Sequence, residues 1–483
     1  MRKVYHILFF ALFIFQFALC KEELFDLPVD LEKKTKVCNL SEFCDEYIKD
    51  IDIEKYIKDE LKSDYIIVSL DECLDIALKN NFDIKIKDHS YLSSKYEYKY
   101  AMSNFLPILS FTTYLTDYRG NILVGGILDD TFHETALSVN ATIAHQLTEG
   151  GRQIFQANAL RALKRATRHD YHYTISQTVF YTFKYYYEML LAKLNIEIYL
   201  RNLIERNAQL KLAQNLNNSG FGTRFDVIRS ENEKAEAKID LLGALNQFRI
   251  SQSKLAYILG IDPKTSLMPF EKEVDSLELL DDGVMLEHYI EMALNYREDL
   301  KEYKDLITFE KQTKNMLMTD FVPKPSINVQ GQYQGTIGNV IKPNYIVTLY
   351  LSWLPDSNSI WGSLAKIRSQ KEKIKIKILQ YQNRYRLIQE QIVQNFSNVD
   401  FNKKQMLIAK KRVDFSQESI KLAMIRFNYG KGILLDVIQA QSQITQARVE
   451  YVSSIIKYNI SQAQLLFDCG KINKDDIIKI YSP

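Results

Sequence analysis

The chain has 483 residues, with 62 Lys+Arg against 60 Asp+Glu, 46% hydrophobic residues and 25% charged residues. A net charge of +2 gives no global positive field, which argues against nucleic acid as a partner. The composition excludes both a disordered chain and a polytopic helical membrane protein. Nine Pro and 17 Gly are few for this length and predict long, unbroken elements.

The N-terminus has the charge pattern of a secretory signal peptide. Arg2 and Lys3 precede an uncharged apolar stretch that ends at Cys20. We therefore predict a signal peptide over residues 1–20 and an N-terminal extension over residues 21–68. Residues 17–20 also resemble a bacterial lipobox with Cys20 as the acylated residue, although Leu19 departs from that pattern, and both interpretations stay open.

The other cysteines are Cys38, Cys44, Cys73 and Cys469, and their spacing matches no zinc signature. In an oxidising compartment Cys38 and Cys44 could form a local disulfide. Free, inert thiols are the alternative.

Two parts of the sequence match at a constant spacing of 210 residues. The matching residues of the first part are Lys211-Leu212-Ala213, Asn218, Gly220, Gly222, Asp226-Val227-Ile228, Ala237, Ile250-Ser251-Gln252, Leu255 and Gly260. Their counterparts in the second part are Lys421-Leu422-Ala423, Asn428, Gly430, Gly432, Asp436-Val437-Ile438, Ala447, Ile460-Ser461-Gln462, Leu465 and Gly470. A weaker match at a spacing of 216 joins Pro107 to Pro323 and Asp83 to Asp299. We predict two tandem copies of one unit, residues 69–270 and 285–472, with an acidic connector over 271–284 and a tail over 473–483.

Each copy is predicted to begin with a helix, over residues 69–103 and 285–320. Apolar residues recur there at threes and fours without an interior proline. Pro107 and Pro323 then end the helices.

After each proline the period changes to two, which predicts a hairpin of strands about ten residues long. In the second copy the apolar face carries Ile327, Val329, Tyr333, Val347, Leu349 and Leu351, and the polar face carries Asn328, Gln330, Gln332 and Gln334. The first copy shows the same alternation less cleanly, over residues 109–116 and 137–143. Loops over residues 120–130 and 335–343 are predicted to connect the strands.

Residues 154–218 and 364–428 contain no Pro or Gly and have apolar residues at helical spacing. Each is predicted as a helix of about 65 residues, roughly 100 Å long. After the turns at residues 220–222 and 430–432, a second helix returns to Gly260 or Gly470. Each copy therefore contains one long antiparallel helical hairpin.

The strand pattern suits the wall of a transmembrane barrel, in which every backbone group must be paired. Four strands cannot close a barrel, since the smallest have about eight, so the barrel would be shared between chains. A trimer would supply twelve strands and a dimer eight, and the polar face favours the wider trimer. A soluble sheet with one solvated face is the alternative. However, helices of this length would have no compact core to join, and would bury their apolar stripes against neighbouring hairpins as a tube.

The duplicated order of helix, strand, strand, long helix and returning helix resembles the TolC-like outer-membrane efflux proteins. So do Gly220-x-Gly222-x-x-x-Asp226-Val227 and Tyr429-Gly430-x-Gly432-x-x-x-Asp436-Val437 at the hairpin tips. The resemblance spans residues 69–470. Between the second strand and the long helix, Gln146-Leu147-Thr148 and Trp353-Leu354-Pro355 depart from the Gln-Pro-Leu-Phe-like turn common in the family.

This resemblance implies a mostly α-helical fold with a membrane β-barrel portion. Duplicated helical hairpins would form an α-barrel tunnel, and four strands per chain would contribute to a trimeric 12-stranded barrel. The implied function is an outer-membrane channel of a tripartite efflux or type I secretion system, with a long periplasmic portion. It would pass drugs or proteins from an inner-membrane transporter and a periplasmic adaptor to the outside, with outer-membrane lipid around the barrel.

The resemblance also implies that the hairpin tips form the periplasmic mouth and meet the adaptor. The tip residues are Gly220, Gly222, Thr223, Arg224, Gly430, Lys431 and Gly432, and the gate candidates are Asp436, Gln439 and Asp226. A ring of three Asp436 carboxylates would attract cations. Either Asp could instead be a helix-start residue stabilised by the helix dipole, and for Asp226 this interpretation is favoured.

No catalytic, cofactor or metal site is predicted, because the sequence contains no phosphate loop, nucleophile elbow or paired-acid motif. His169 and His172 have metal-ligand spacing but no evident third ligand, so a solvated helix surface is favoured. The alternative of a different class is a secreted coiled-coil scaffold or adhesin with a soluble β-cap.

Overall fold

The computed structural model describes residues 37–39, 64–124, 127–146, 149–281, 283–336, 342–353, 359–472 and 474. The predicted signal peptide, Cys20, Cys44 and the side chain of Cys38 lie outside the described part, so the lipobox and the disulfide stay predictions. Cys73 and Cys469 are free and buried, and burial raises the pKa of both thiols.

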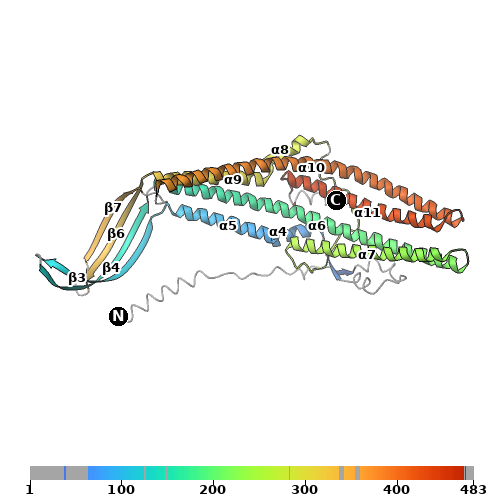
Figure 1. The fold of residues 1–483 in the computed structure, drawn as a ribbon, viewed down its shortest axis with the longest axis horizontal. Coiled ribbons are helices and arrows are strands. Elements are labelled where there is room, and N and C mark those ends of the chain that lie inside the picture. Colours follow the sequence, from blue (N-terminus) through green and yellow to red (C-terminus); the bar gives the residue numbers. More distant parts are fainter. Residues whose placement is uncertain are drawn as a thin grey trace.

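The molecule is long and thin, with helices along most of its length and a sheet at one end (Figure 1). The helices are α4 (Leu70–Asn80), α5 (Phe82–Ser103), α6 (Arg152–Asn218), α7 (Arg224–Leu259), α8 (Leu286–Tyr296), α9 (Glu298–Met318), α10 (Ile360–Asn428) and α11 (Leu434–Asp468), with short 3₁₀ turns η2 (Glu149–Gly151) and η3 (Thr319–Phe321). The strands are β1 (Val37–Asn39), β2 (Asp64–Val68), β3 (Ile108–Val124), β4 (Ile127–Gln146), β5 (Leu267–Pro269), β6 (Lys324–Thr336) and β7 (Lys342–Ser352).

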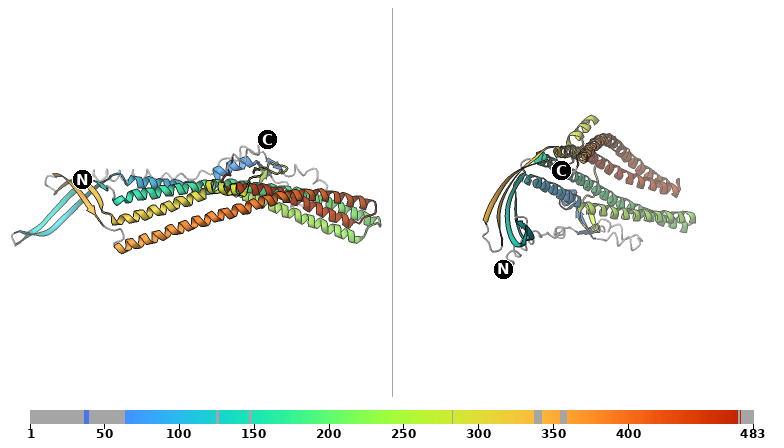
Figure 2. Two further views of the ribbon diagram at one scale, coloured as in Figure 1. Left: turned by 90° about the horizontal axis from the view of Figure 1, so that it is seen from above. Right: turned by 60° about the vertical axis from the view of Figure 1, so that its left-hand side comes forward.

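The two long helices are confirmed as α6, with 67 residues, and α10, with 69. α6 packs against α5 and α9 on the side toward the large sheet, and against α7 and α11 on the side toward the hairpin tips. α10 packs beside α9 and then α11. The helices of the two copies therefore lie side by side (Figure 2).

β3, β4, β6 and β7 form an antiparallel sheet in that order, which we call the wall sheet. The predicted loop over residues 120–130 is wrong for most of its length, because β3 runs to Val124 and β4 starts at Ile127. The strands of this hairpin have 17 and 20 residues, and their backbone pairing continues through the glycine-containing segment. β6 and β7 have 13 and 11 residues.

A second, smaller sheet, the belt sheet, was not predicted. β2 pairs with β1 antiparallel and with β5 in parallel. Side chains of β2, β5 and α4 bury the middle of α6, where Phe183, Tyr186 and Leu190 are almost completely buried. The main hydrophobic core therefore lies midway along the helices.

The predicted single helices over residues 69–103 and 285–320 are wrong, because each is broken once. The break residues are Asn81 and Arg297, which have extended backbone ψ angles of 128° and 123°. The Asn81 side chain donates to the Ile258 carbonyl over 2.8 Å, and Arg297 donates to the Asp468 carbonyl over 3.2 Å. Each break therefore pairs with the end of the returning helix of its own copy.

Two recurring residues of the repeat have a structural role beside these breaks. A Cβ atom on Gly260 would lie 2.5 Å from the Asn80 carbonyl oxygen, and one on Gly470 would lie 3.0 Å from the Arg297 nitrogen. Both glycines also have positive φ, at 69° and 71°. Only glycine allows the returning helix to end this close to the break.

Candidate functional site: the wall sheet and the hairpin tips

The wall sheet has its apolar face exposed. Leu349 is 72% exposed, and Val329, Tyr333, Val347 and Leu351 are exposed as well, while Ile327 is half-buried. The register aligns Val329 with Val347 and Ile327 with Leu349, so these side chains share one face. The predicted apolar face of the second hairpin is thus one continuous surface in the structure.

On the inner strands β4 and β6 the opposite face is polar and more buried. On the edge strands this face is exposed as well, and on β7 it includes Ile346 and Tyr350. Asn140 is 2% exposed and Ser138 is 3% exposed, both on β4. Asn328, Gln330 and Gln332 are half-buried on β6, and the side chain of Gln334 lies outside the described part. A soluble sheet usually buries its apolar face and exposes its polar face, so this sheet has the reverse arrangement.

Each hairpin tip is built by two glycines with different roles. Gly220 and Gly430 have φ of 78° and 66°, and a Cβ added to either would meet no atom within 4 Å. A Cβ on Gly222 would lie 2.9 Å from the Leu216 Cβ, and one on Gly432 would lie 3.2 Å from the Arg426 Cβ. The first glycine therefore supplies the left-handed turn and the second allows close approach to the preceding helix.

The two acidic residues after the tips have different surroundings. Asp226 belongs to a capping box: its carboxylate accepts from the Thr223 amide over 3.2 Å and from the Thr223 hydroxyl over 2.6 Å. At the equivalent place in the second copy Ile433 cannot form such a cap. Asp436 is half-buried and its carboxylate makes no hydrogen bond or ion pair within the described residues, while Gln439 is exposed.

The two hairpins are held together near the tips by Arg206 of α6, which is 3% exposed. Its guanidinium donates to the Ile438 carbonyl over 3.3 Å and to the Ser442 hydroxyl over 2.5 Å, and lies 3.4 Å from Glu233 of α7. Burial lowers the pKa of Arg206, although neighbouring carboxylates oppose this shift. Sequence reasoning missed Arg206, because it lies between Glu205 and Asn207 in a polar stretch of the helix that gives no distinct signal.

The two histidines do not form a joint site. His169 Nδ1 lies 2.5 Å from Glu298 Oε2 and Nε2 lies 3.6 Å from Asp305 Oδ2, so this side chain joins α6 to α9. The prediction of a solvated surface is therefore wrong for His169, which is half-buried. His172 instead accepts from Arg168 over 3.4 Å.

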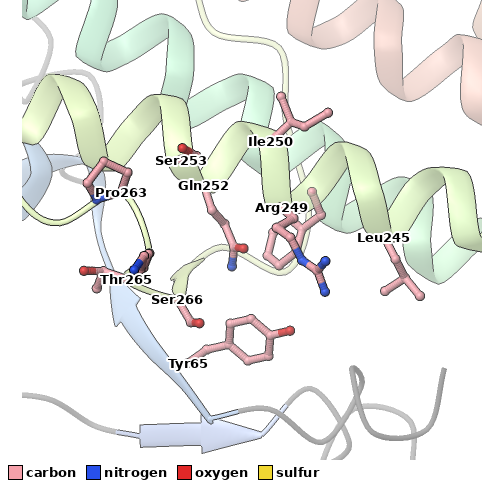
Figure 3. Close-up of a pocket in the computed structure, with 11 residues that line it drawn as sticks. Tyr65, Leu245, Arg249, Ile250, Gln252, Ser253, Pro263, Thr265 and Ser266 are labelled. Atoms are coloured by element: carbon pink, nitrogen blue, oxygen red, sulfur yellow. The ribbon is translucent and has the colours of Figure 1, made fainter. Parts of the chain in front are cut away.

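A cavity of about 510 Å³ lies between α7, the belt sheet and the loop that joins them (Figure 3). Tyr65, Arg249 and Ser253 are among its lining residues, and none of the described lining residues is a carboxylate, histidine or cysteine. The amide of Gln252 donates to the Leu267 carbonyl over 2.6 Å, so it holds the loop in place. Gln462, its equivalent in the second copy, donates instead to the carbonyl of Leu277 in the connector, over 2.9 Å.

Among the described residues, no helix is both long and apolar enough to span a membrane, and no group of three His, Cys, Asp or Glu could hold a metal ion.

Comparisons with solved structures show the fold. The outer-membrane channel OprN matches with a TM-score of 0.74 at 16% identity, covering 83% of this chain and 90% of that one. The CmeC outer membrane channel of Campylobacter jejuni matches with a TM-score of 0.71 at 14% identity, covering 94% and 97%. VceC, an outer membrane protein of Vibrio cholerae, matches with a TM-score of 0.71 at 13% identity, covering 83% and 96%.

No curated protein matches the chain significantly. The model of the outer membrane efflux protein family matches residues 73–261 and 358–470, which together are more than half of the chain. The chain therefore belongs to the outer membrane efflux protein family, a family of channels rather than enzymes, and the resemblance to TolC-like proteins is confirmed.

Proposed function

We propose that three copies of this chain form a tunnel through the outer membrane and the periplasm. The tunnel passes drugs or proteins from an inner-membrane transporter and a periplasmic adaptor to the outside. Family membership supports an efflux-type channel. The observation that carries the proposal is the wall sheet, which exposes an apolar face while the polar face of its inner strands β4 and β6 is more buried.

The edges of the wall sheet support assembly from several chains. Among the described residues β3 pairs only with β4, and β7 only with β6. Because the four strands alternate in direction, β7 of one copy would run antiparallel to β3 of the next. Three copies then give a twelve-stranded barrel with a lumen lined by the polar face.

The helices support the same assembly. Phe401, Ile408, Phe415 and Leu422 of α10 are exposed and recur every seven residues. An apolar heptad repeat is typical of a seam between packed helices. In the other copy Ile228, Ile239 and Ile250 of α7 are also exposed. Packing α10 of one protomer against α7 of the next would bury both sets.

The mass of the full mature chain in mild detergent, together with its conductance in a planar bilayer, tests this proposal. We expect about three times the mass of one chain and open channels. Fractionation with soluble proteins and no conductance would instead support the scaffold or adhesin alternative. A monomer that still inserts into lipid would contradict the shared barrel.

Arginine on the apolar face of the wall sheet should prevent insertion. We expect Val347→Arg or Leu349→Arg to cost about 2–4 kcal/mol near the bilayer midplane, because the charge would enter lipid. Gln330→Arg, on the polar face, is the matched control and should mainly change conductance. Denaturant titration in lipid vesicles measures the cost, and equal tolerance of all three variants would mean that the strands do not form a barrel wall.

Asp436 is proposed as the periplasmic gate residue, with Gln439 about one helical turn further along. A ring of three carboxylates should select cations and bind a trivalent cation added from the periplasmic side. Asp436→Ala should then raise conductance, lower cation selectivity and weaken the trivalent block.

Asp226→Ala is the matched control, because its carboxylate is already used in the capping box. The Thr223 hydroxyl still accepts from the backbone amide of residue 226 in this variant. The substitution should therefore cost only about 0.3–1 kcal/mol in stability and leave selectivity unchanged. Recordings of both variants in planar bilayers test the gate assignment. If Asp436→Ala keeps the same cation selectivity and the same block by a trivalent cation, Asp436 is a helix-start residue and not a gate residue.

A further inference from the structure

Where the long helices begin, next to the wall sheet, the chain carries a dense positive charge. The first 20 residues of α6 contain five Lys or Arg and one acid, Asp170, and the first 19 residues of α10 contain six Lys or Arg and one acid, Glu372. Arg152 pairs with the buried Asp320 over 3.1 Å and is set aside. We call the remaining cations the basic collar: Arg161, Lys164, Arg165, Arg168, Lys366, Arg368, Lys371, Lys373, Lys375 and Lys377.

Most of the basic collar forms no ion pair within the described part of the chain. Four of these unpaired collar residues lie on α10 and are exposed: Lys366, Arg368, Lys371 and Lys373. Two described members do form ion pairs, Arg165 with Asp305 and Lys375 with Glu372. Helix electrostatics do not account for the pattern either, because cations near a helix N-terminus face the positive end of the dipole. Lys377 also interacts electrostatically with Glu302 of α9. The four exposed cations of α10, in contrast, are not neutralised by a described carboxylate of the same chain and can attract an external anion.

Exposed tryptophans mark the boundary between the basic collar and the wall sheet. The chain has only two Trp residues. Trp353 directly follows β7 and is 62% exposed, and Trp361, the second residue of α10, is 82% exposed. Tyr100, near the end of α5, is exposed as well. Figure 1 shows that the wall sheet adjoins α5 and α10 at this level. Exposed Trp and Tyr at the edge of an apolar surface are typical of a membrane–water interface.

The helix geometry directs the collar toward that interface. Lys366 lies about 9 Å and Lys371 about 16 Å from the start of α10 at 1.5 Å per residue. Side chains of a helix tilt toward its N-terminus, which here is the sheet end. Long Lys and Arg side chains can extend their charges further in the same direction. The remaining cations lie about 12–26 Å along their helices. This exceeds a Debye length of about 10 Å, so those nearest the helix starts contribute most of the attraction at the interface.

We propose that the basic collar binds the head groups of anionic phospholipids in the periplasmic leaflet of the outer membrane. The proposal rests on the proposed insertion of the wall sheet into that membrane. A phosphodiester head group fits because it presents negative charge at the level of the exposed tryptophans, next to apolar side chains that face acyl chains. Continuity of the apolar, aromatic and basic surfaces favours lipid over another polyanion such as peptidoglycan.

The test compares three full-length proteins purified in mild detergent. The collar variant combines Lys366→Gln, Arg368→Gln, Lys371→Gln and Lys373→Gln. The control variant combines Lys410→Gln, Lys411→Gln, Lys421→Gln and Arg426→Gln, which removes the same charge from exposed positions near the other end of α10. Each protein is equilibrated with equal amounts of phosphatidylglycerol and phosphatidylcholine that have identical acyl chains, and the retained lipid is measured by mass spectrometry.

The wild-type and control proteins should retain phosphatidylglycerol preferentially, and the collar variant should lose at least about tenfold of that preference. High salt should reduce the preference in the wild-type protein. Equal retention of both lipids by the wild-type protein, or an unchanged preference in the collar variant, would overturn the proposal. The proposal would also be overturned if the wild-type protein showed no lipid preference and instead sedimented with purified peptidoglycan in a way that depends on the collar charges.

Conductance in bilayers of pure phosphatidylcholine separates this proposal from the channel itself. If all three proteins conduct there and none prefers phosphatidylglycerol, the collar proposal fails and the channel stands. If none conducts in any bilayer, the proposed function fails and the collar proposal fails with it.

Discussion

Arg297→Ala should lower the free energy of unfolding by about 3–5 kcal/mol, because it removes one partner from a buried charge cluster. Arg297 is 2% exposed, and its guanidinium donates to both carboxylate oxygens of Asp299, over 3.0 and 2.8 Å. Asp468 Oδ1 lies 3.7 Å away. Arg384 of α10 also reaches Asp299, over 2.7 Å. The variant would leave two buried carboxylates with only one arginine between them.

Denaturant titration of the full chain in detergent, followed by circular dichroism, measures this loss. Arg386→Ala is the control, since Arg386 is exposed on α10 and its removal should change stability by no more than about 0.5 kcal/mol. An equal cost for both variants would show that the cluster contributes no stability.

The pH dependence gives an independent check on the cluster. Burial raises the pKa of Asp299, but hydrogen bonds and charges from Arg297 and Arg384 outweigh burial and keep its pKa below the usual value. A carboxyl with a depressed folded-state pKa adds stability above its unfolded pKa, and this stability is lost as pH falls through the folded one. The deficit of Arg297→Ala should therefore shrink in acid. A deficit that stays constant down to about pH 3, below the usual Asp value, would contradict this account.

Gly260→Ala should lower the free energy of unfolding by more than Gly220→Ala, the other glycine substitution proposed in the first copy. The new Cβ would lie 2.5 Å from the Asn80 carbonyl oxygen and 2.8 Å from the Asn80 carbonyl carbon, both backbone atoms. The positive φ of 69° adds about 1–2 kcal/mol. Displacing packed backbone adds about 1–3 kcal/mol, so the total should be about 2–5 kcal/mol.

Gly220→Ala separates the two contributions. Gly220 has a similar φ of 78°, but no atom lies within 4 Å of a Cβ at this position. It should show only the backbone cost of about 1–2 kcal/mol. Denaturant unfolding of both variants measures the difference between their losses of stability. Equal losses would mean that the backbone at Asn80 can move away from the new Cβ at no cost.

The sequence alone predicts the elements that local pattern determines. The absence of Pro and Gly gives the two long helices, and the change of period after Pro107 and Pro323 gives the strands. The break at Arg297 has no such signal, because Arg is a good helix former. Asn81 does carry a local signal, since its side chain caps α5 by accepting from the Ile84 amide over 3.1 Å. Both breaks also depend on contacts with carbonyls at residues 258 and 468, far along the chain.

The candidate site shows a similar limit. Asp226 and Asp436 occupy equivalent places in the repeat, and the sequence favours a helix-start role for Asp226 but leaves both roles open for Asp436. The structure ties Asp226 to Thr223, whereas Ile433 stands in the equivalent place. Comparison of residues 223 and 433 could have indicated this difference, because only a Thr, Ser, Asp or Asn side chain completes the cap.

The reversed faces of the wall sheet also bear on how the channel is made. The helices of one chain bury a core of their own midway along their length. The sheet exposes apolar side chains and two edge strands, β3 and β7, which unpaired would join other chains indiscriminately. We therefore expect a newly exported copy to fold its helical part in water and to need a holding chaperone over its strands until copies meet at the membrane. Assembly should then depend on how fast the chain is produced, with aggregation through the strands increasing when production outpaces insertion.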